Sequence, residues 1–133
     1  MHNPTPDRMG NRTIIDSFRH AFAGLWHALR TQRNTRIHLV IAAIVVALGL
    51  WLQISFAEWA VLVLTIGFVL VSEMLNTMAE SLVDLITPDY HPHAKIVKDV
   101  AAGAVLLGAI IAVLVGLLIL GPPLWSRVLG VAQ

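Results

Sequence analysis

The sequence predicts an all-α membrane protein with one N-terminal amphipathic surface helix and three transmembrane helices. Of its 133 residues, 57% are hydrophobic and only 13% are charged, whereas a soluble domain carries roughly 25% charged residues. The hydrophobic residues gather in three long runs, each near the length of a membrane span. In the segment before the first run, apolar and polar residues recur with the period of an α-helix. Much of the surface must therefore face lipid rather than water.

Composition also excludes several classes of protein. There is no cysteine, which rules out a disulfide scaffold and a thiolate metal site. The net charge of +1 creates no global field that would favour nucleic acid. The first residues lack the apolar core and cleavage site of a signal peptide, so we expect the first hydrophobic run to insert uncleaved. A chain of this length forms one domain with few helices to surround a polar site, which favours an oligomer.

Residues 1–12 are polar and are predicted to form a flexible tail, and an amphipathic helix follows. Thr13 and Asp16 match a helix-capping pair at its start. Basic and apolar residues take opposite sides of this helix, a pattern that suits the membrane interface. The alternative is a face buried in a soluble core, which the spans that follow disfavour. The apolar side comprises Ile14, Ile15, Phe18, Phe22, Leu25, Trp26 and Leu29.

The integral membrane domain is predicted to cover residues 13–121, with a short C-terminal tail over 122–133. A span needs ~20 residues, and the first two apolar runs reach that length with flanking residues. We expect the second helix to continue beyond its apolar part to residue 86, because Pro88 disfavours a helical conformation in the residue before it. The Gly-Pro-Pro sequence after Leu120 is expected to end the third helix. The predicted spans cover residues 37–54, 57–75 and 99–120.

Basic residues predict how the chain is oriented in the membrane. Lys95 and Lys98 lie between the second and third spans, while the loop between the first and second has no Lys or Arg. By the positive-inside rule, the N-terminus and the second loop are cytoplasmic and the C-terminus lies outside. The arginines before the first span are Arg8, Arg12, Arg19, Arg30, Arg33 and Arg36. The tryptophans near the predicted outer interface are Trp51, Trp59 and Trp125.

Polar residues at the end of the second span form the candidate site. Glu73, Asn76, Glu80 and Asp84 are spaced i, i+3, i+7 and i+11, so a helix brings them onto one stripe. A carboxylate at or near the depth of the bilayer costs free energy, so it usually faces a polar cavity or a partner. The alternative is a helix that emerges into water with solvated charges. This alternative has more weight for Asp84 than for Glu73, which closely follows the apolar run.

Lys98 and Asp99 lie at the start of the third span, where the short second loop can return them to the acidic stripe. Carboxylates bind Mg²⁺ together with substrate phosphates, and a neighbouring lysine balances phosphate charge. The cluster therefore favours a phosphate–metal site over an ion path. The alternatives are a lysine that snorkels to lipid headgroups and a small ion channel. The sequence has no Walker A or kinase glycine-rich motif, and its histidine spacing does not predict a zinc site.

The stripe and the residues around it resemble a known family. Their pattern is similar to that of bacterial diacylglycerol kinases and undecaprenol kinases, and the Arg-Asn-Thr-Arg-Ile-His sequence over 33–38 resembles the undecaprenol kinase branch in particular. The similarity covers about Ser17 to Leu120. The residues that carry it are Glu73, Asn76, Glu80, Asp84, Asp89, Tyr90, His91, Lys98 and Asp99.

The resemblance implies a homotrimer with composite active sites in the bacterial inner membrane. It also implies transfer of the γ-phosphate of Mg-ATP to a lipid hydroxyl at the cytoplasmic interface, with undecaprenol favoured as the acceptor over diacylglycerol. Glu73 then takes the position of the general base, Asn76 helps to orient the reacting groups and Glu80 binds the metal. The nucleotide-contacting positions correspond to Lys98, Asp99, Asp89, Tyr90 and His91.

Two residues depart from the family pattern. The family usually has a glutamate that binds the metal together with the second-helix glutamate, and this chain has Gln32 there. An amide oxygen can coordinate Mg²⁺ but brings no charge, and no glutamate precedes Glu58. His20 stands where the enteric diacylglycerol kinases carry an aromatic contact to the nucleotide. Gln32 leaves open a degenerate, non-catalytic member of the family that binds lipid or nucleotide or supports a partner.

Overall fold

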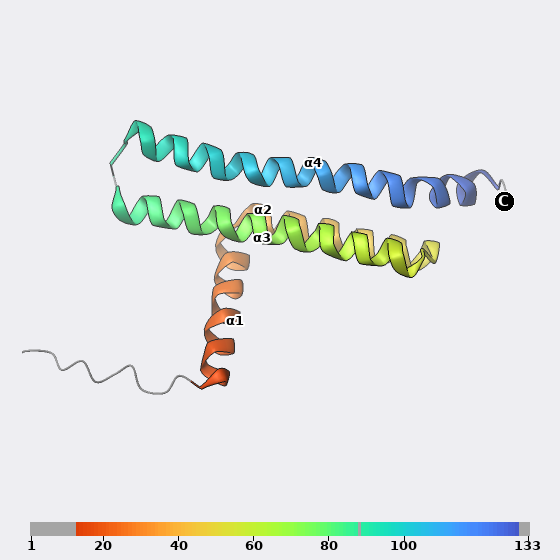
Figure 1. The fold of residues 1–133 in the computed structure, drawn as a ribbon, viewed down its shortest axis with the longest axis horizontal. Helices are drawn as coiled ribbons and strands as arrows, with labels where there is room; N and C mark the ends of the chain where they lie inside the picture. Colours follow the sequence, from red (N-terminus) through yellow and green to blue (C-terminus); the bar gives the residue numbers. More distant parts are fainter. Residues whose placement is uncertain (1–12, 88, 131–133) are drawn as a thin grey trace, which may run out of the picture.

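A computed structural model describes residues 13–87 and 89–130 of the chain. The predicted tail over 1–12 and the predicted helix stop at Pro88 lie outside the described residues. The described part is built from helices alone, which confirms the all-α prediction (Figure 1). The helices are α1 (Ile14–Thr31), α2 (Arg33–Leu52), α3 (Phe56–Ile86) and α4 (Pro92–Leu129).

The three long helices run side by side, and α1 leaves them crosswise (Figure 1). α3 and α4 form an antiparallel hairpin, and α2 packs against both. The corner between α1 and α2 is a single residue, Gln32, whose backbone is extended (φ −98°, ψ 117°). Its N–H still donates to Ala28 O at 2.9 Å, which closes the last turn of α1. One residue therefore both ends α1 and starts α2 in a new direction.

Local capping explains where the helices begin and end. The Thr13 side chain accepts a hydrogen bond from the backbone N–H of Asp16 at 3.3 Å, which confirms the predicted capping pair. Ser55 and Glu58 form a reciprocal capping box at the start of α3, which satisfies two otherwise free donors. Gln53 ends α2 in the left-handed conformation (φ 55°). These caps make the turn between α2 and α3 short and the two helices antiparallel.

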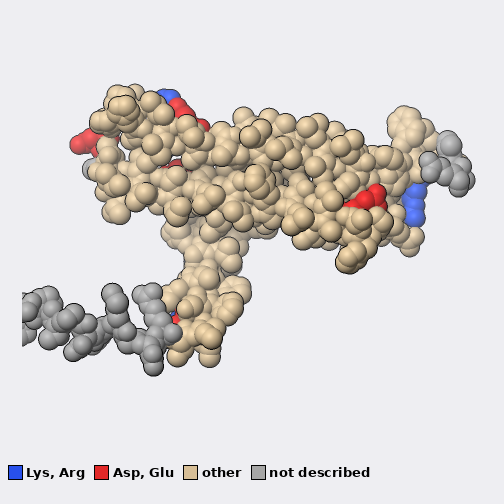
Figure 2. All heavy atoms as spheres, in the orientation of Figure 1, with Lys and Arg blue, Asp and Glu red and all other residues tan. Residues whose placement is uncertain are grey.

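α2, α3 and α4 are each long and apolar enough to cross a membrane. α3 has 31 residues and is therefore about 46 Å long at 1.5 Å per residue, which exceeds a hydrocarbon core of roughly 30 Å. α3 is therefore longer than an untilted span requires, and it continues to Ile86, the residue at which it was predicted to end. On the face shown in Figure 2, charged side chains lie near the two ends of the long bundle and not along its middle.

The third apolar helix is longer than the predicted membrane span within it. α4 begins at Pro92 and not at residue 99, and it continues to Leu129. The helix therefore extends beyond the predicted span over 99–120 at both ends. Pro122 and Pro123 remove two backbone donors from the helix, but later contacts hold the last turns in place. Arg127 donates to Trp51 O at 2.8 Å, and its guanidinium lies 5.3 Å from the centre of the Trp51 ring.

Candidate active site

Buried polar side chains gather at one level of the bundle. Glu73, on α3, is only 1% exposed, and Asn76 is 7% exposed. Elsewhere in the described residues the buried side chains are apolar, as in the cluster of Leu52, Leu62 and Leu120 towards the opposite end of the bundle. The complete set of buried polar residues in the described part is Thr35, Ser72, Glu73, Asn76 and Thr77. Because burying polar groups is costly unless they are paired, this level of the bundle is the candidate site.

Two of these side chains are satisfied within their own helix. The Thr77 hydroxyl donates to Glu73 O at 2.9 Å, and the Ser72 hydroxyl donates to Phe68 O at 2.9 Å. Such bonds to the preceding turn are common for helical Ser and Thr. Other buried atoms have no hydrogen-bond partner among the described residues, and they are Glu73 Oε1, Asn76 Oδ1 and Thr35 Oγ1. An unpaired buried polar atom costs about 1–3 kcal/mol, so these three atoms are the groups of the site that are free to accept or donate a further hydrogen bond.

Glu80 is held by two amide groups. Gln32 Nε2 donates to Glu80 Oε2 at 3.3 Å, and Asn76 Nδ2 donates to Glu80 Oε1 at 3.1 Å. The first bond joins the corner between α1 and α2 to α3, across 48 positions of the chain. The structure therefore brings Gln32, Asn76 and Glu80 together. Gln32 thus lies beside Glu80 at the position where the family resemblance implies a glutamate.

His38 is a member of the site that the sequence analysis did not assign. Its Nε2 lies 3.1 Å from Glu73 Oε1, and its side chain is 20% exposed. The two groups form an ion pair when the imidazole is protonated. They are not hydrogen-bonded, because Oε1 has no hydrogen-bond partner among the described residues. The signal was the spacing of Thr35 and His38, which places both on one side of α2.

Lys98 and Asp99 form no hydrogen bond or ion pair with Gln32, Asn76 or Glu80 among the described residues. Lys98 Nζ donates to Asp84 Oδ1 across the α3–α4 hairpin, so Lys98 meets the far end of the predicted stripe. Asp99 pairs with Lys95, one turn earlier on α4. The side chains of Lys98 and Asp84 are 38% and 66% exposed, and exposed pairs of this kind contribute about 0–1 kcal/mol. The stripe therefore divides into a buried part around Glu73 and an exposed part at Asp84.

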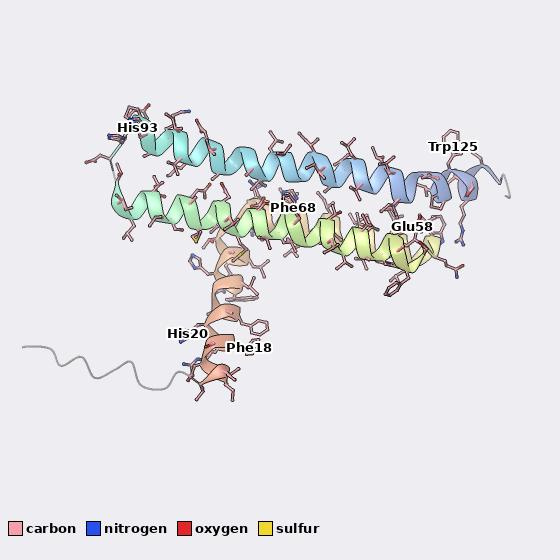
Figure 3. All side chains as sticks on the ribbon, in the orientation of Figure 1. Phe18, His20, Glu58, Phe68, His93 and Trp125 are labelled. Carbon is pink, nitrogen blue, oxygen red and sulfur yellow. The ribbon has the colours of Figure 1, made fainter. Side chains whose placement is uncertain are left out.

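The remaining predicted nucleotide residues are exposed. Asp89 and Tyr90 lie in the turn between α3 and α4. His91 caps α4, and its Nδ1 accepts from the backbone N–H of His93 at 3.2 Å. His20 is exposed on α1, which extends away from the bundle, whereas His93 lies at the α3–α4 corner (Figure 3). The structure of one chain does not join these residues to the Glu80 cluster through any hydrogen bond or ion pair among the parts it describes.

An apolar groove of about 360 Å³ runs between α2, α3 and α4. His38 lines it near one end and Leu124 lines it at the other. Apart from His38, the side chains that line it are apolar except for Thr65, whose hydroxyl donates to Val61 O. The groove therefore offers an apolar path along the bundle to the imidazole that contacts Glu73.

The described residues contain no group of three or more His, Asp or Glu side chains that could hold a metal ion by themselves. The acidic groups nearest each other in the buried site are Glu73 and Glu80, which lie seven positions apart on α3. Any cation here would thus need oxygen atoms from amide groups or from a substrate in addition to a carboxylate.

Three apolar spans with a buried acidic site near one end define a small integral membrane protein of the helical type. The family model for prokaryotic diacylglycerol kinase matches residues 19–120. The chain belongs to this family and is a lipid kinase.

The chain is similar to proteins named as kinases of two different lipids. Undecaprenol kinase of Bacillus subtilis is 45% identical over 111 residues, which cover 84% of this chain and 90% of that protein. Diacylglycerol kinase of Synechocystis is 49% identical over 114 residues, which cover 85% of this chain and 65% of that protein. Diacylglycerol kinase of Escherichia coli is 28% identical over 118 residues, which cover 89% of this chain and 93% of that protein.

Proposed function

We propose that the chain transfers the γ-phosphoryl group of Mg-ATP to the terminal hydroxyl of undecaprenol. The observation that carries this proposal is Glu73, a carboxylate that is 1% exposed and lies beside the apolar groove through its contact with His38. A lipid whose tail follows the groove would bring its hydroxyl to this carboxylate. The 45% identity with the Bacillus subtilis undecaprenol kinase supports the choice of acceptor.

The roles of the buried residues follow from their contacts. Glu73 accepts the proton of the lipid hydroxyl as that oxygen bonds to the γ-phosphorus and ADP leaves. Asn76 has a buried Oδ1 without a hydrogen-bond partner among the described residues, and this atom orients the reacting hydroxyl or phosphate. Transfer of this kind depends on positioning and charge more than on covalent help from the protein.

The residues around Glu80 fit a magnesium ion that is bound together with nucleotide. Mg²⁺ is usually held by one or two carboxylates plus substrate phosphates, and Glu80 supplies one carboxylate beside the amides of Gln32 and Asn76. When bound, the ion neutralises charge on the phosphates. Gln32 contributes an oxygen without a charge, so we expect weaker metal binding than a second carboxylate would provide.

Nucleotide contacts are assigned to the cytoplasmic end of the α3–α4 hairpin. We assign them to Lys98, Asp99 and the segment over 89–91, with a weaker role for His20. Lys98 can exchange its contact with Asp84 for a phosphate, because an exposed ion pair holds it only weakly. Asp84 then acts as a resting partner for the lysine and not as a metal ligand.

The placement in the membrane is also part of the proposal. α1 exposes Phe18, Phe22 and Trp26, and Arg30 lies 5.5 Å from the centre of the Trp26 ring. Aromatic and basic side chains together suit a helix that lies in the membrane interface. We therefore place α1 and the α3–α4 turn at the cytoplasmic surface of the bacterial inner membrane, the C-terminus outside, and the chain in a homotrimer.

The decisive experiment offers undecaprenol and diacylglycerol separately, in mixed micelles with ³²P-labelled Mg-ATP. We expect faster transfer to undecaprenol, and loss of transfer in a folded Glu73→Gln variant. Faster transfer to diacylglycerol would instead make the protein a diacylglycerol kinase, which the 49% identity with the Synechocystis enzyme favours as the second candidate. No transfer to either lipid by a folded chain would identify a degenerate member, the reading that Gln32 motivates.

A further inference from the structure

We propose that His38 is a positioning residue that holds the Glu73 carboxylate in place for the reaction. The inference rests on the proposed function, because it assigns a role within the same site. His38 Nε2 is 3.1 Å from Glu73 Oε1, and the carboxylate is almost fully buried. No other basic side chain in the described residues lies within ion-pair distance of Glu73. The imidazole is therefore the group that can compensate the buried charge.

The surroundings make this contact more than a surface ion pair. α2 presents His38 to α3 and also buries Thr35, and Glu80, which is part-buried, is the next acidic group along α3. α4 approaches through Gly108, where an added Cβ would lie 3.2 Å from Phe68 Cε1 and 3.7 Å from Ser72 Oγ. At Gly108, α4 therefore approaches α3 with its backbone and with no charged side chain. In such a poorly solvated place the electrostatic influence of a single nearby imidazole on the direction of a carboxylate is strong.

His38 also lines the apolar groove, so it borders both the path for the lipid and the carboxylate. Glu73 Oε1 is close to the imidazole without a hydrogen bond from it. The lone pairs of this oxygen therefore stay available to accept the proton of an arriving hydroxyl, while the nearby imidazole restricts the carboxylate to one direction. His38 acts through Glu73 and need not touch the phosphate.

The test compares three replacements of His38 in the full chain, with undecaprenol and Mg-ATP in mixed micelles. Leucine fills a similar volume and suits an apolar groove, but it has no polar group. Glutamine places a partly positive NH₂ group close to the position of Nε2, and asparagine places one too early along the side chain. His27→Gln, at an exposed position on α1, is the matched control and should leave the rate unchanged.

We expect His38→Leu and His38→Asn to lower kcat by roughly 100-fold, the cost of misplacing a reacting group by about 1 Å. The KM for ATP should not change, and His38→Gln should recover most of the loss.

A packing role predicts the opposite order of activity, with His38→Leu more active than His38→Gln, and would overturn the inference. Full activity in all three variants would also overturn it. If leucine prevents folding, the comparison of glutamine with asparagine decides. Failure of the unaltered chain to phosphorylate any lipid overturns the proposed function instead, and is recognised before any variant is made.

Discussion

At the scale of single residues, the site depends on two carboxylates of one helix that have different neighbours. Glu73 is buried beside His38, whereas Glu80 is held by the amide groups of Gln32 and Asn76. One carboxylate is thus next to a group that can be cationic, and the other is next to neutral donors. Different surroundings allow the same side-chain type to serve as a base in one place and as a metal ligand in another.

Gln32→Glu tests the assignment of Glu80 to the metal. The change places a second carboxylate beside Glu80 and removes the 3.3 Å hydrogen bond that Gln32 donates. We expect the Mg²⁺ concentration for half-maximal lipid phosphorylation to fall about tenfold, because affinity follows the number of charged ligands. We also expect a lower unfolding temperature in EDTA that Mg²⁺ restores, since two adjacent carboxylates repel each other without a cation.

Gln53→Glu is the control for this change, because it adds the same charge at the other end of α2. Its Mg²⁺ requirement should equal that of the unaltered chain. An unchanged Mg²⁺ requirement in Gln32→Glu would mean that Gln32 and Glu80 do not share the metal.

At the scale of helices, close contacts at the end remote from the site control how α2 packs. An added Cβ at Gly49 would lie 2.9 Å from Trp59 Cζ2 and Cη2 and 3.2 Å from Ile54 Cδ1. The rigid indole ring cannot move as easily as the end of a flexible chain. Gly49 is therefore needed where α2 turns into α3, at the end opposite to Glu73.

Gly49→Ala should destabilise the fold without changing the chemistry. Overpacking of this kind costs about 1–3 kcal/mol, which should appear as a lower unfolding temperature in detergent, with kcat unchanged well below that temperature. Gly24→Ala on α1 is the matched control, because no atom lies within 4 Å of its added Cβ. Equal unfolding temperatures for the two variants would show that the Trp59 contact does not limit packing.

At the scale of the whole molecule, large apolar side chains along the three long helices remain exposed. Leu64 is 74% exposed and Leu118 is 76% exposed. So continuous an apolar surface is unfavourable in water, as expected for helices that face the lipid of a membrane. Under the proposed homotrimer, Lys98 and Asp99 would meet Glu80 of a neighbouring subunit, since within one chain they bond to Asp84 and Lys95 instead.

Mixing two inactive variants tests the composite site. If Glu73 and Lys98 of one site come from different subunits, co-expressed Glu73→Gln and Lys98→Met chains form mixed trimers in which some sites have both residues intact. We therefore expect lipid phosphorylation to return in the mixture, although each variant alone is inactive. Glu73→Gln mixed with Asn76→Ala is the control, because both changes affect α3 and no site regains both residues. Absence of recovery in the first mixture would place the complete site within one chain.

Features that depend on local spacing could be predicted from the sequence. The capping pair at Thr13, the apolar spans and the continuation of α3 to Ile86 all follow from helical periodicity and from turn residues. The placement of Glu73, Asn76 and Glu80 on one face follows from the same periodicity. These properties need only neighbours in the chain, so the order of the residues determines them.

Contacts between helices could not be predicted in the same way. The approach of His38 to Glu73, the bond from Gln32 to Glu80 and the groove along the bundle depend on how α2 is aligned against α3. The continuation of α4 through Pro122 and Pro123 accompanies contacts such as that of Arg127 with Trp51. Packing between distant segments sets these features, because the free energy of each depends on partners that helical spacing alone does not identify.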